Sequence, residues 1–208
     1  MKSTVEPWDQ RIARALVRPL ANTPVTPNHI TAFSIALCLF GSVLLATGEP
    51  SMTYWGAGVF VLGRFLDHFD GELARLTGKK SRFGYYFDYA AGGISYVALF
   101  LCLGIGASKS PLGGWAIALG LTGAMAAIIS LFLNLGIDQA NEDIAEDEGE
   151  AVGYPSIAGF ELEDGIYLLA PITWLGFLQP FFVAAGIGAS FYCLWTLWRL
   201  VGLRNRIP

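Results

Sequence analysis

Charged residues, cysteines and histidines are all scarce in this chain of 208 residues. Asp, Glu, Lys and Arg together make up 14% of it, hydrophobic residues make up 54%, and the mean hydropathy is +0.51. This balance argues against a water-soluble domain, and apolar runs of about 18 residues or more are long enough to cross a bilayer. The unbroken runs also lack the alternation of barrel strands. We therefore expect an all-α integral membrane protein.

The few cysteines and histidines exclude several kinds of site. Cys38, Cys102 and Cys193 each lie inside an apolar run without paired spacing, so we expect neither a disulfide framework nor a zinc site. His29 and His68 form no arrangement typical of nucleophilic catalysis with Ser or Cys. The net charge of −4 says little about partners, because the charges are segregated along the chain, and we expect no nucleic-acid partner. The polar N-terminal stretch of about 26 residues predicts no cleavable signal peptide.

Six apolar segments predict six membrane spans in a single domain, 1–208. Pro171 falls in the fifth segment and predicts a kink there. The spans cover about 30–47, 52–75, 83–105, 112–135, 160–176 and 178–201. Residues 6–20 precede them and predict an amphipathic helix, which either lies in the membrane interface or packs on the domain. Its apolar stripe consists of Trp8, Ile12, Leu16 and Leu20.

One polar segment, 67–92, stands between the apolar runs. Asp67 and Asp70 are one helical turn apart, and Asp88 belongs to the next predicted helix. Carboxylates beside membrane helices are costly and persist mainly where they bind something. Three carboxylates from two helices form a hard-oxygen site suited to Mg²⁺, Mn²⁺ or Ca²⁺. A divalent ion with an arginine nearby predicts a phosphate or pyrophosphate ligand.

The same segment resembles the signature of the CDP-alcohol phosphotransferase family, D-x2-D-G-x2-A-R-x8-G-x3-D-x3-D. The chain has Gly92 where the signature ends in Asp. The other seven positions match: Asp67, Asp70, Gly71, Ala74, Arg75, Gly84 and Asp88. The resemblance implies transfer of a phospho-alcohol group from a CDP-linked donor to an acceptor alcohol, with release of CMP, in phospholipid or polar head-group synthesis. It also implies a homodimer, and glycine-rich faces in the third and fourth spans would permit close helix packing.

The resemblance assigns roles to the matching residues. One or two Mg²⁺ or Mn²⁺ ions would be held by Asp67, Asp70 and Asp88. The cytidine and phosphate pocket would be shaped by Gly71, Ala74 and Arg75. Gly84 would let two helices approach closely. A weaker likeness in the stretch P-N-x-I-T adds Asn28 and Thr31 as candidate donor contacts, with helix capping as the alternative. The donor would be of the CDP-diacylglycerol or CDP-inositol type.

Gly92 cannot serve as the general base that the family's last aspartate supplies. A positioned base contributes on the order of 10²–10⁴-fold to a rate, so a carboxylate elsewhere is expected to replace it. Candidates at the start of the fifth span are Glu161, Glu163 and Asp164, with Asp138 next. Alternatively the acceptor needs no base, or the chain is an inactivated copy or a pseudoenzyme that binds CDP-lipid. The acidic segment 138–150 is typical of a solvated loop, or else of a lid or a metal-attracting rim.

The distribution of Lys and Arg predicts the orientation. With six spans, twelve of these residues fall on the side of both termini and of the signature segment, and only Lys109 falls on the other side. Positive residues gather on the cytoplasmic side of membrane proteins. We therefore expect the inner or cytoplasmic membrane, with the active site and both termini cytoplasmic.

Overall fold

The computed structural model describes residues 8–144, 156–157 and 160–204. Side chains are described for residues 12–139 and 165–203. Within these ranges the chain is helical apart from one short antiparallel β pair, so the all-α prediction is confirmed. The helices are α1 (Trp8–Val17), η1 (Arg18–Asn22), α2 (Pro27–Ala46), α3 (Pro50–Thr77), α4 (Arg82–Ala107), α5 (Gly114–Ile144), η2 (Leu162–Leu168), α6 (Leu169–Trp174) and α7 (Leu178–Arg204). The β pair is β1 (Ser156–Ile157) with β2 (Phe160–Glu161).

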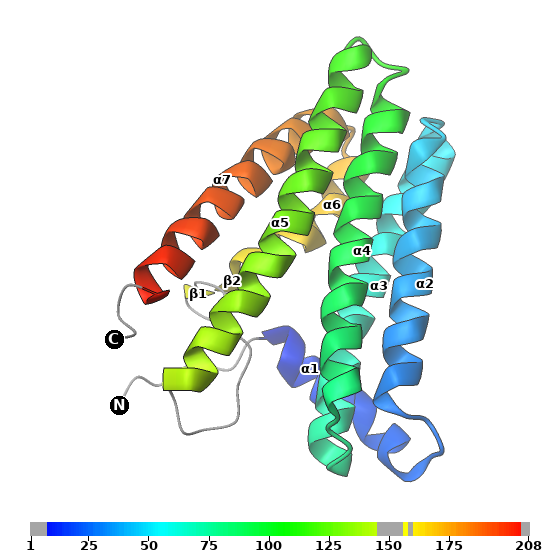
Figure 1. Ribbon diagram of the computed structural model, residues 1–208. Coiled ribbons are helices and arrows are strands. Elements are labelled where there is room, and N and C mark those ends of the chain that lie inside the picture. The colour runs from blue at the N-terminus through cyan, green and yellow to red at the C-terminus, as the bar shows by residue number, and fades with distance from the viewer. Residues whose placement is uncertain (1–7, 145–155, 158–159, 205–208) are drawn as a thin grey trace.

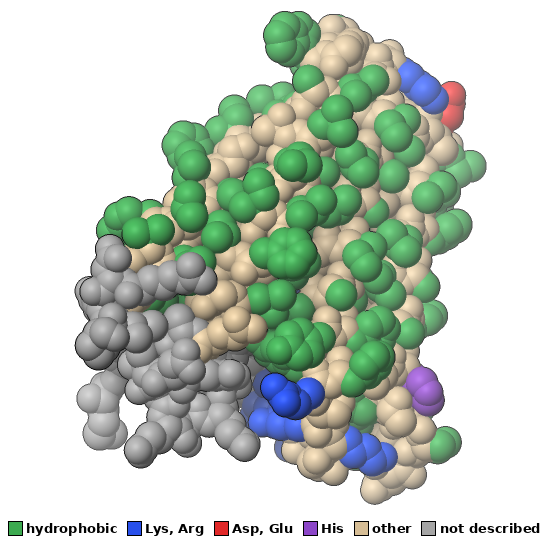
Figure 2. Space-filling model, in the orientation of Figure 1, with side chains coloured by type: hydrophobic (Ala, Val, Ile, Leu, Met, Phe, Trp, Pro, Cys, Tyr) green, Lys and Arg blue, Asp and Glu red, His purple; other side chains and the backbone are tan. Residues whose placement is uncertain are grey.

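The long helices form one bundle in which α2, α3, α4 and α5 alternate in direction, while α7 runs the same way as α5 (Figure 1). The turn from α3 to α4 and the short helix α1 lie at one end of this bundle, and the turn from α4 to α5 lies at the other. Figure 2 shows Lys and Arg side chains gathered at the end where α3 meets α4, while hydrophobic side chains cover the flank. Large apolar side chains such as Phe40, Phe132 and Trp198 are exposed, which suits contact with lipid.

Four helices of the described part are both long and apolar enough to cross a membrane. They are Pro27–Ala46, Arg82–Ala107, Gly114–Gln139 and Leu178–Leu203, and they match four of the six predicted spans. Helix α3 matches the second predicted span and is 28 residues long, but it carries the charged residues of the signature. The count of six spans therefore stays a prediction.

The fifth predicted span, 160–176, differs most from its prediction. It consists of the 3-10 helix η2 followed by the six-residue helix α6. Pro171 is the third residue of α6, in its first turn, where a helix tolerates proline. The segment thus changes helix type ahead of Pro171, and the proline does not kink a continuous helix.

Helix α5 also departs from its prediction, because it continues to Ile144 instead of ending near residue 135. Gly136 by itself does not stop a helix, and no proline follows it within α5. Asp138, predicted to start a solvated loop, is instead a buried helical residue. The rest of the acidic segment, 145–150, lies outside the described residues.

Helix α1 packs on α3 through Ala13 and Val17, both fully buried. Two residues of the predicted apolar stripe, Ile12 and Leu16, are exposed, whereas Leu20 packs against the same cluster. The helix therefore packs on the domain and also presents an apolar face outward. Its placement in the membrane interface stays a prediction.

Close contacts at glycines hold α2 against α3. A Cβ atom at Gly41 would lie 2.6 Å from the Phe60 nitrogen, and one at Gly63 would lie 2.7 Å from Cys38 Sγ and 2.9 Å from the Ser34 carbonyl oxygen. Only glycine fits at such distances. This contact brings the next turns of α2 against the start of the signature on α3.

The glycines of the third and fourth predicted spans are also used inside the bundle. A Cβ atom at Gly120 would lie 2.6 Å from the Phe100 carbonyl oxygen, and one at Gly104 would lie 2.9 Å from the Ala116 carbonyl oxygen. These positions hold α4 against α5 in one chain. The homodimer stays a prediction that they do not support.

We predict that Gly63→Leu destabilises the fold by about 1–3 kcal/mol or more, because the new side chain overpacks the α2–α3 contact. Thermal unfolding in detergent measures this effect. Gly188→Leu on α7 is the matched control, since none of the described neighbours comes within 4 Å of a Cβ there. Equal melting temperatures for the two variants would contradict the packing argument.

Candidate metal centre

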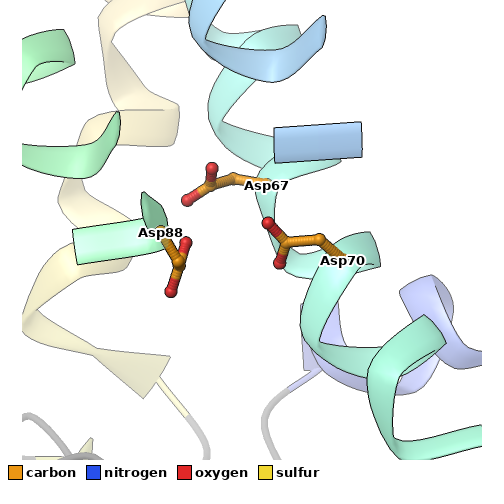
Figure 3. Close-up of side chains that lie close together, drawn as sticks. All are labelled: Asp67, Asp70 and Asp88. Carbon is orange, nitrogen blue, oxygen red and sulfur yellow. The ribbon is translucent and has the colours of Figure 1, made fainter. Parts of the chain in front are cut away.

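Three carboxylates meet between α3 and α4. Asp67 and Asp70 extend from α3 and Asp88 extends from α4, and all three point toward one shared space (Figure 3). Each offers an oxygen, and these oxygens all lie within 4.8 Å of one another. Asp70 is buried, Asp67 is partly buried and Asp88 is exposed. The arrangement can hold a divalent cation by hard oxygen ligands and leaves one side accessible.

Two hydroxyl groups of α2 orient the carboxylates of α3. Ser34 Oγ donates a hydrogen bond to Asp67 Oδ1 at 3.0 Å, and Thr31 Oγ1 donates one to Asp70 Oδ2. Both hydroxyl residues are almost fully buried. Thr31, predicted as a donor contact, thus bonds directly to a candidate metal ligand. Ser34 was not predicted, although its position one turn after Thr31 on α2 is a signal that could have identified it.

Arg64 lies one turn before Asp67 and was likewise not assigned to the site. Its Nη1 donates to Asp67 Oδ2 at 2.7 Å, and its guanidinium carbon lies 5.1 Å from the centre of the Tyr96 ring. Only 5% of Arg64 is exposed. A buried guanidinium is therefore fixed directly beside the carboxylates.

Arg75 of the signature lies at the edge of the site. Its Nη2 donates to Glu72 Oε1 at 2.6 Å, and Arg14 of α1 donates from Nε to Glu72 Oε2 at 2.9 Å. A Cβ atom at Gly71 would lie 3.6 Å from Arg75 Nη2, so the guanidinium lies over this glycine. The buried Glu72 thus ties α1 to the signature helix, while the side chain of Arg75 remains half exposed.

The beginnings of α2 and α4 meet next to this cluster. Ser81 caps α4 by accepting a hydrogen bond from the Gly84 nitrogen at 3.0 Å. A Cβ atom at Gly84 would lie 3.2 Å from Asn28 Oδ1, so glycine allows the close approach that the sequence predicted. Thr26 occupies the N-cap of α2 and donates its N–H to His29 Nδ1 at 3.3 Å. Asn28 is therefore not the cap of this helix.

The model of the CDP-alcohol phosphatidyltransferase family matches residues 24–198. The chain belongs to this family. Archaetidylinositol phosphate synthase of Pyrococcus horikoshii is 28% identical to it over 190 residues, which cover 88% of this chain and 96% of that protein. Family membership indicates a CDP-alcohol phosphatidyltransferase activity in phospholipid synthesis, in an integral membrane protein.

Solved structures of a Mycobacterium tuberculosis enzyme share the fold. Phosphatidylinositol phosphate synthase with CDP-DAG bound superposes with a TM-score of 0.68 at 18% identity, covering 91% of this chain and 94% of that one. The same enzyme in complex with manganese and citrate gives a TM-score of 0.67 at 19% identity, covering 96% and 93%. At these identities the likeness shows the fold alone.

Within the described part of the chain, the ligand cluster offers no further acid for the replacement base that the sequence predicted. The three acids that cluster among the described residues are the three predicted metal ligands themselves. Side chains of the first candidates, Glu161, Glu163 and Asp164, lie outside the described ones, although Tyr167 of the same segment packs on α3 with its ring 6.5 Å from that of His68.

Asp138, the next candidate, is engaged by two phenols of α4. Tyr85 and Tyr89 both donate hydrogen bonds from their hydroxyl groups to its Oδ2, that of Tyr85 at 2.9 Å. Tyr85 and Tyr89 lie one turn apart on the helix that carries Asp88 and Gly92. This group ties α5 to α4 close to the signature, so a structural role accounts for the buried carboxylate.

We predict that Thr31→Val weakens Mn²⁺ binding by about 10–100-fold, because Asp70 loses the hydroxyl that orients it, as happens when the supporting partners of metal ligands are removed. Titration of the purified protein with Mn²⁺, followed by the electron paramagnetic resonance of the free ion, measures the affinity. Thr122→Val on α5 is the control, since its hydroxyl donates to the Ala118 carbonyl oxygen of its own helix and lies on a helix that contributes none of the three clustered carboxylates. An unchanged affinity in Thr31→Val would exclude an orienting role.

Proposed function

We propose that this protein catalyses the metal-dependent transfer of a phospho-alcohol group from a CDP-linked lipid donor to an acceptor alcohol, with release of CMP. The main observation behind this proposal is that a member of this family has three carboxylates whose oxygens lie within 4.8 Å of one another. Carboxylate oxygens suit Mg²⁺ and Mn²⁺. The manganese and CDP-DAG complexes of the M. tuberculosis enzyme, which shares the fold, support a metal and a lipid-linked donor.

The residues of the site have separate roles in the proposed reaction. Asp67, Asp70 and Asp88 would hold the cation, with the first two oriented by the hydroxyls of α2. When bound, a divalent ion would polarise the phosphoryl oxygens and stabilise the charge on the departing CMP. Arg75, half exposed beside Gly71, would present a guanidinium to the phosphate groups. Ala74 would keep the cytidine side of the pocket open, and Gly84 would let α4 approach Asn28 of α2 closely.

The reaction exchanges one phosphorus–oxygen bond for another. The acceptor hydroxyl oxygen attacks the phosphorus atom that bears the lipid, and the bond from this phosphorus to CMP breaks. CMP leaves with the bonding electrons, and the hydroxyl proton passes to a general base. Glu161, Glu163 and Asp164 are the proposed bases, because the segment they share leads to Tyr167, which packs on α3 beside the signature.

The names of two similar proteins suggest which donor and acceptor to propose. The P. horikoshii relative is named for an archaetidylinositol phosphate product and the M. tuberculosis enzyme for a phosphatidylinositol phosphate product. We therefore propose a CDP-diacylglycerol type of donor and an inositol phosphate as the first acceptor to test, with CDP-inositol as the alternative donor. We also propose a homodimer, which the family resemblance implies. An active site on the cytoplasmic side is supported by the Lys and Arg side chains at the end of the bundle where α3 meets α4.

The second candidate function is a pseudoenzyme that binds CDP-lipid without turnover. Gly92 alone favours it. A pseudoenzyme would bind the donor at the metal centre and release no CMP with any acceptor.

We predict that Asp70→Asn lowers metal-dependent CMP release at least about 100-fold, because the site loses a charged ligand of the ion. The assay uses purified protein with CDP-diacylglycerol, inositol phosphate and Mg²⁺ or Mn²⁺. Glu49→Gln, at the far end of α3, is the control and is expected to retain activity. Donor binding by the wild type without CMP release would favour the pseudoenzyme.

We predict that one of the three variants Glu161→Gln, Glu163→Gln and Asp164→Asn lowers kcat by about 10²–10⁴-fold, since it removes the base. Donor and metal affinity are expected to stay unchanged in that variant, because the metal ligands are intact. The other two variants serve as its matched controls. Wild-type rates in all three would show that the base lies elsewhere.

A further inference from the structure

Position 92, where the family signature has its last aspartate, faces the guanidinium of Arg64. A Cβ atom at Gly92 would lie 3.9 Å from Arg64 Nη1. Gly92 is on α4 one turn after Asp88, and Arg64 is on α3 one turn before Asp67. Arg64 and the missing aspartate therefore belong to the same corner of the site.

Arg64 is held in this corner from both helices. Its Nη1 pairs with Asp67 Oδ2 at 2.7 Å, and its guanidinium stacks over Tyr96, one turn beyond Gly92 on α4. With 5% exposure it has little freedom to leave. Arginine stays protonated in proteins, so this corner carries a permanent positive charge.

The charges that the three clustered carboxylates and Arg64 bring together among the described residues match a single divalent ion. Three carboxylates and one guanidinium leave two negative charges, which one Mg²⁺ or Mn²⁺ neutralises. Four carboxylates, as in the full family signature, would leave four negative charges if no arginine lay beside them, and would suit two such ions. Buried charge is costly unless it is compensated.

We propose that Arg64 takes the place of a second cation, so that this site binds one divalent ion. The proposal rests on the proposed function, because it concerns the ion which that function requires. In this proposal Arg64 is a positioning residue that orients Asp67 and sets the number of bound ions. The chain can then have Gly92 and still keep the other seven positions of the family signature.

The proposal also changes what restoring the aspartate would do. An aspartate side chain introduced at position 92 would extend from a Cβ position 3.9 Å from Nη1, and its carboxylate would pair with Arg64. Gly92→Asp alone would therefore not create a second metal position. Removing the guanidinium at the same time would leave four carboxylates facing one another.

The test is the number of Mn²⁺ ions bound per chain, measured without substrate by electron paramagnetic resonance of the free ion. We expect one ion for the wild type, one for Gly92→Asp, and two for the double variant Arg64→Gln, Gly92→Asp. Two ions on the wild type would overturn the proposal. One ion on a folded double variant would overturn it as well.

Arg64→Gln alone keeps the test decisive should the double variant not fold. Loss of a positive charge 2.7 Å from Asp67 is expected to tighten binding of the ion by about tenfold or more. Arg199→Gln on α7 is the matched control, since this guanidinium also stacks on an aromatic ring, 5.5 Å from the centre of Trp195, and α7 contributes no ligand to the cluster. Equal affinities for the Arg64→Gln variant and the wild type would overturn the proposal.

Parallel measurement of CMP release separates this proposal from the proposed function. A wild type that releases CMP and binds two ions would overturn the single-ion proposal and leave the transferase intact. A wild type that binds neither ion nor donor and releases no CMP would overturn both.

Discussion

Carboxylates that face one another repel, and the fold has to hold Asp67, Asp70 and Asp88 close enough together to share one cation. It does so from a third helix. The close α2–α3 contact at Gly41 and Gly63 brings short hydroxyl side chains of α2 within hydrogen-bond distance of the acids on α3. A wider helix spacing would leave these hydroxyls out of reach, so the geometry of the site depends on backbone contacts one to several turns away.

Compensation of charge explains how α3 remains in an apolar bundle. Its buried acid Glu72 bonds to guanidinium groups of α1 and of its own next turn, and its buried Arg64 pairs with Asp67. Isolated buried charges would be strongly destabilising, whereas paired and hydrogen-bonded ones are tolerated. The same pairs give the short helix α1 a fixed connection to the signature, next to its apolar contact with α3.

Gly92 and Arg64 are best considered together. Glycine at position 92 leaves a corner of the site without a carboxylate, and the guanidinium that faces this corner is positive and buried. In our proposals, glycine at this position alters the base and the metal content, and the residues that would hold the donor are unchanged. The 3-10 helix η2, which precedes the short α6, contacts α3 through Tyr167. It belongs to the acidic segment that contains the proposed bases.

Local sequence determined the long helices and the identity of the cluster. Apolar runs and Pro or Gly boundaries located α2, α3, α4 and α7 to within a few residues, and the spacing of Asp67 and Asp70 placed them on one helical face, since both signals act within one element. Tertiary structure decided the parts that lie between elements. Ser34 and Arg64 joined the site, and Asp138 became buried beneath two tyrosines. These contacts depend on which helix faces which, and helical periodicity in one segment carries no information about its neighbour.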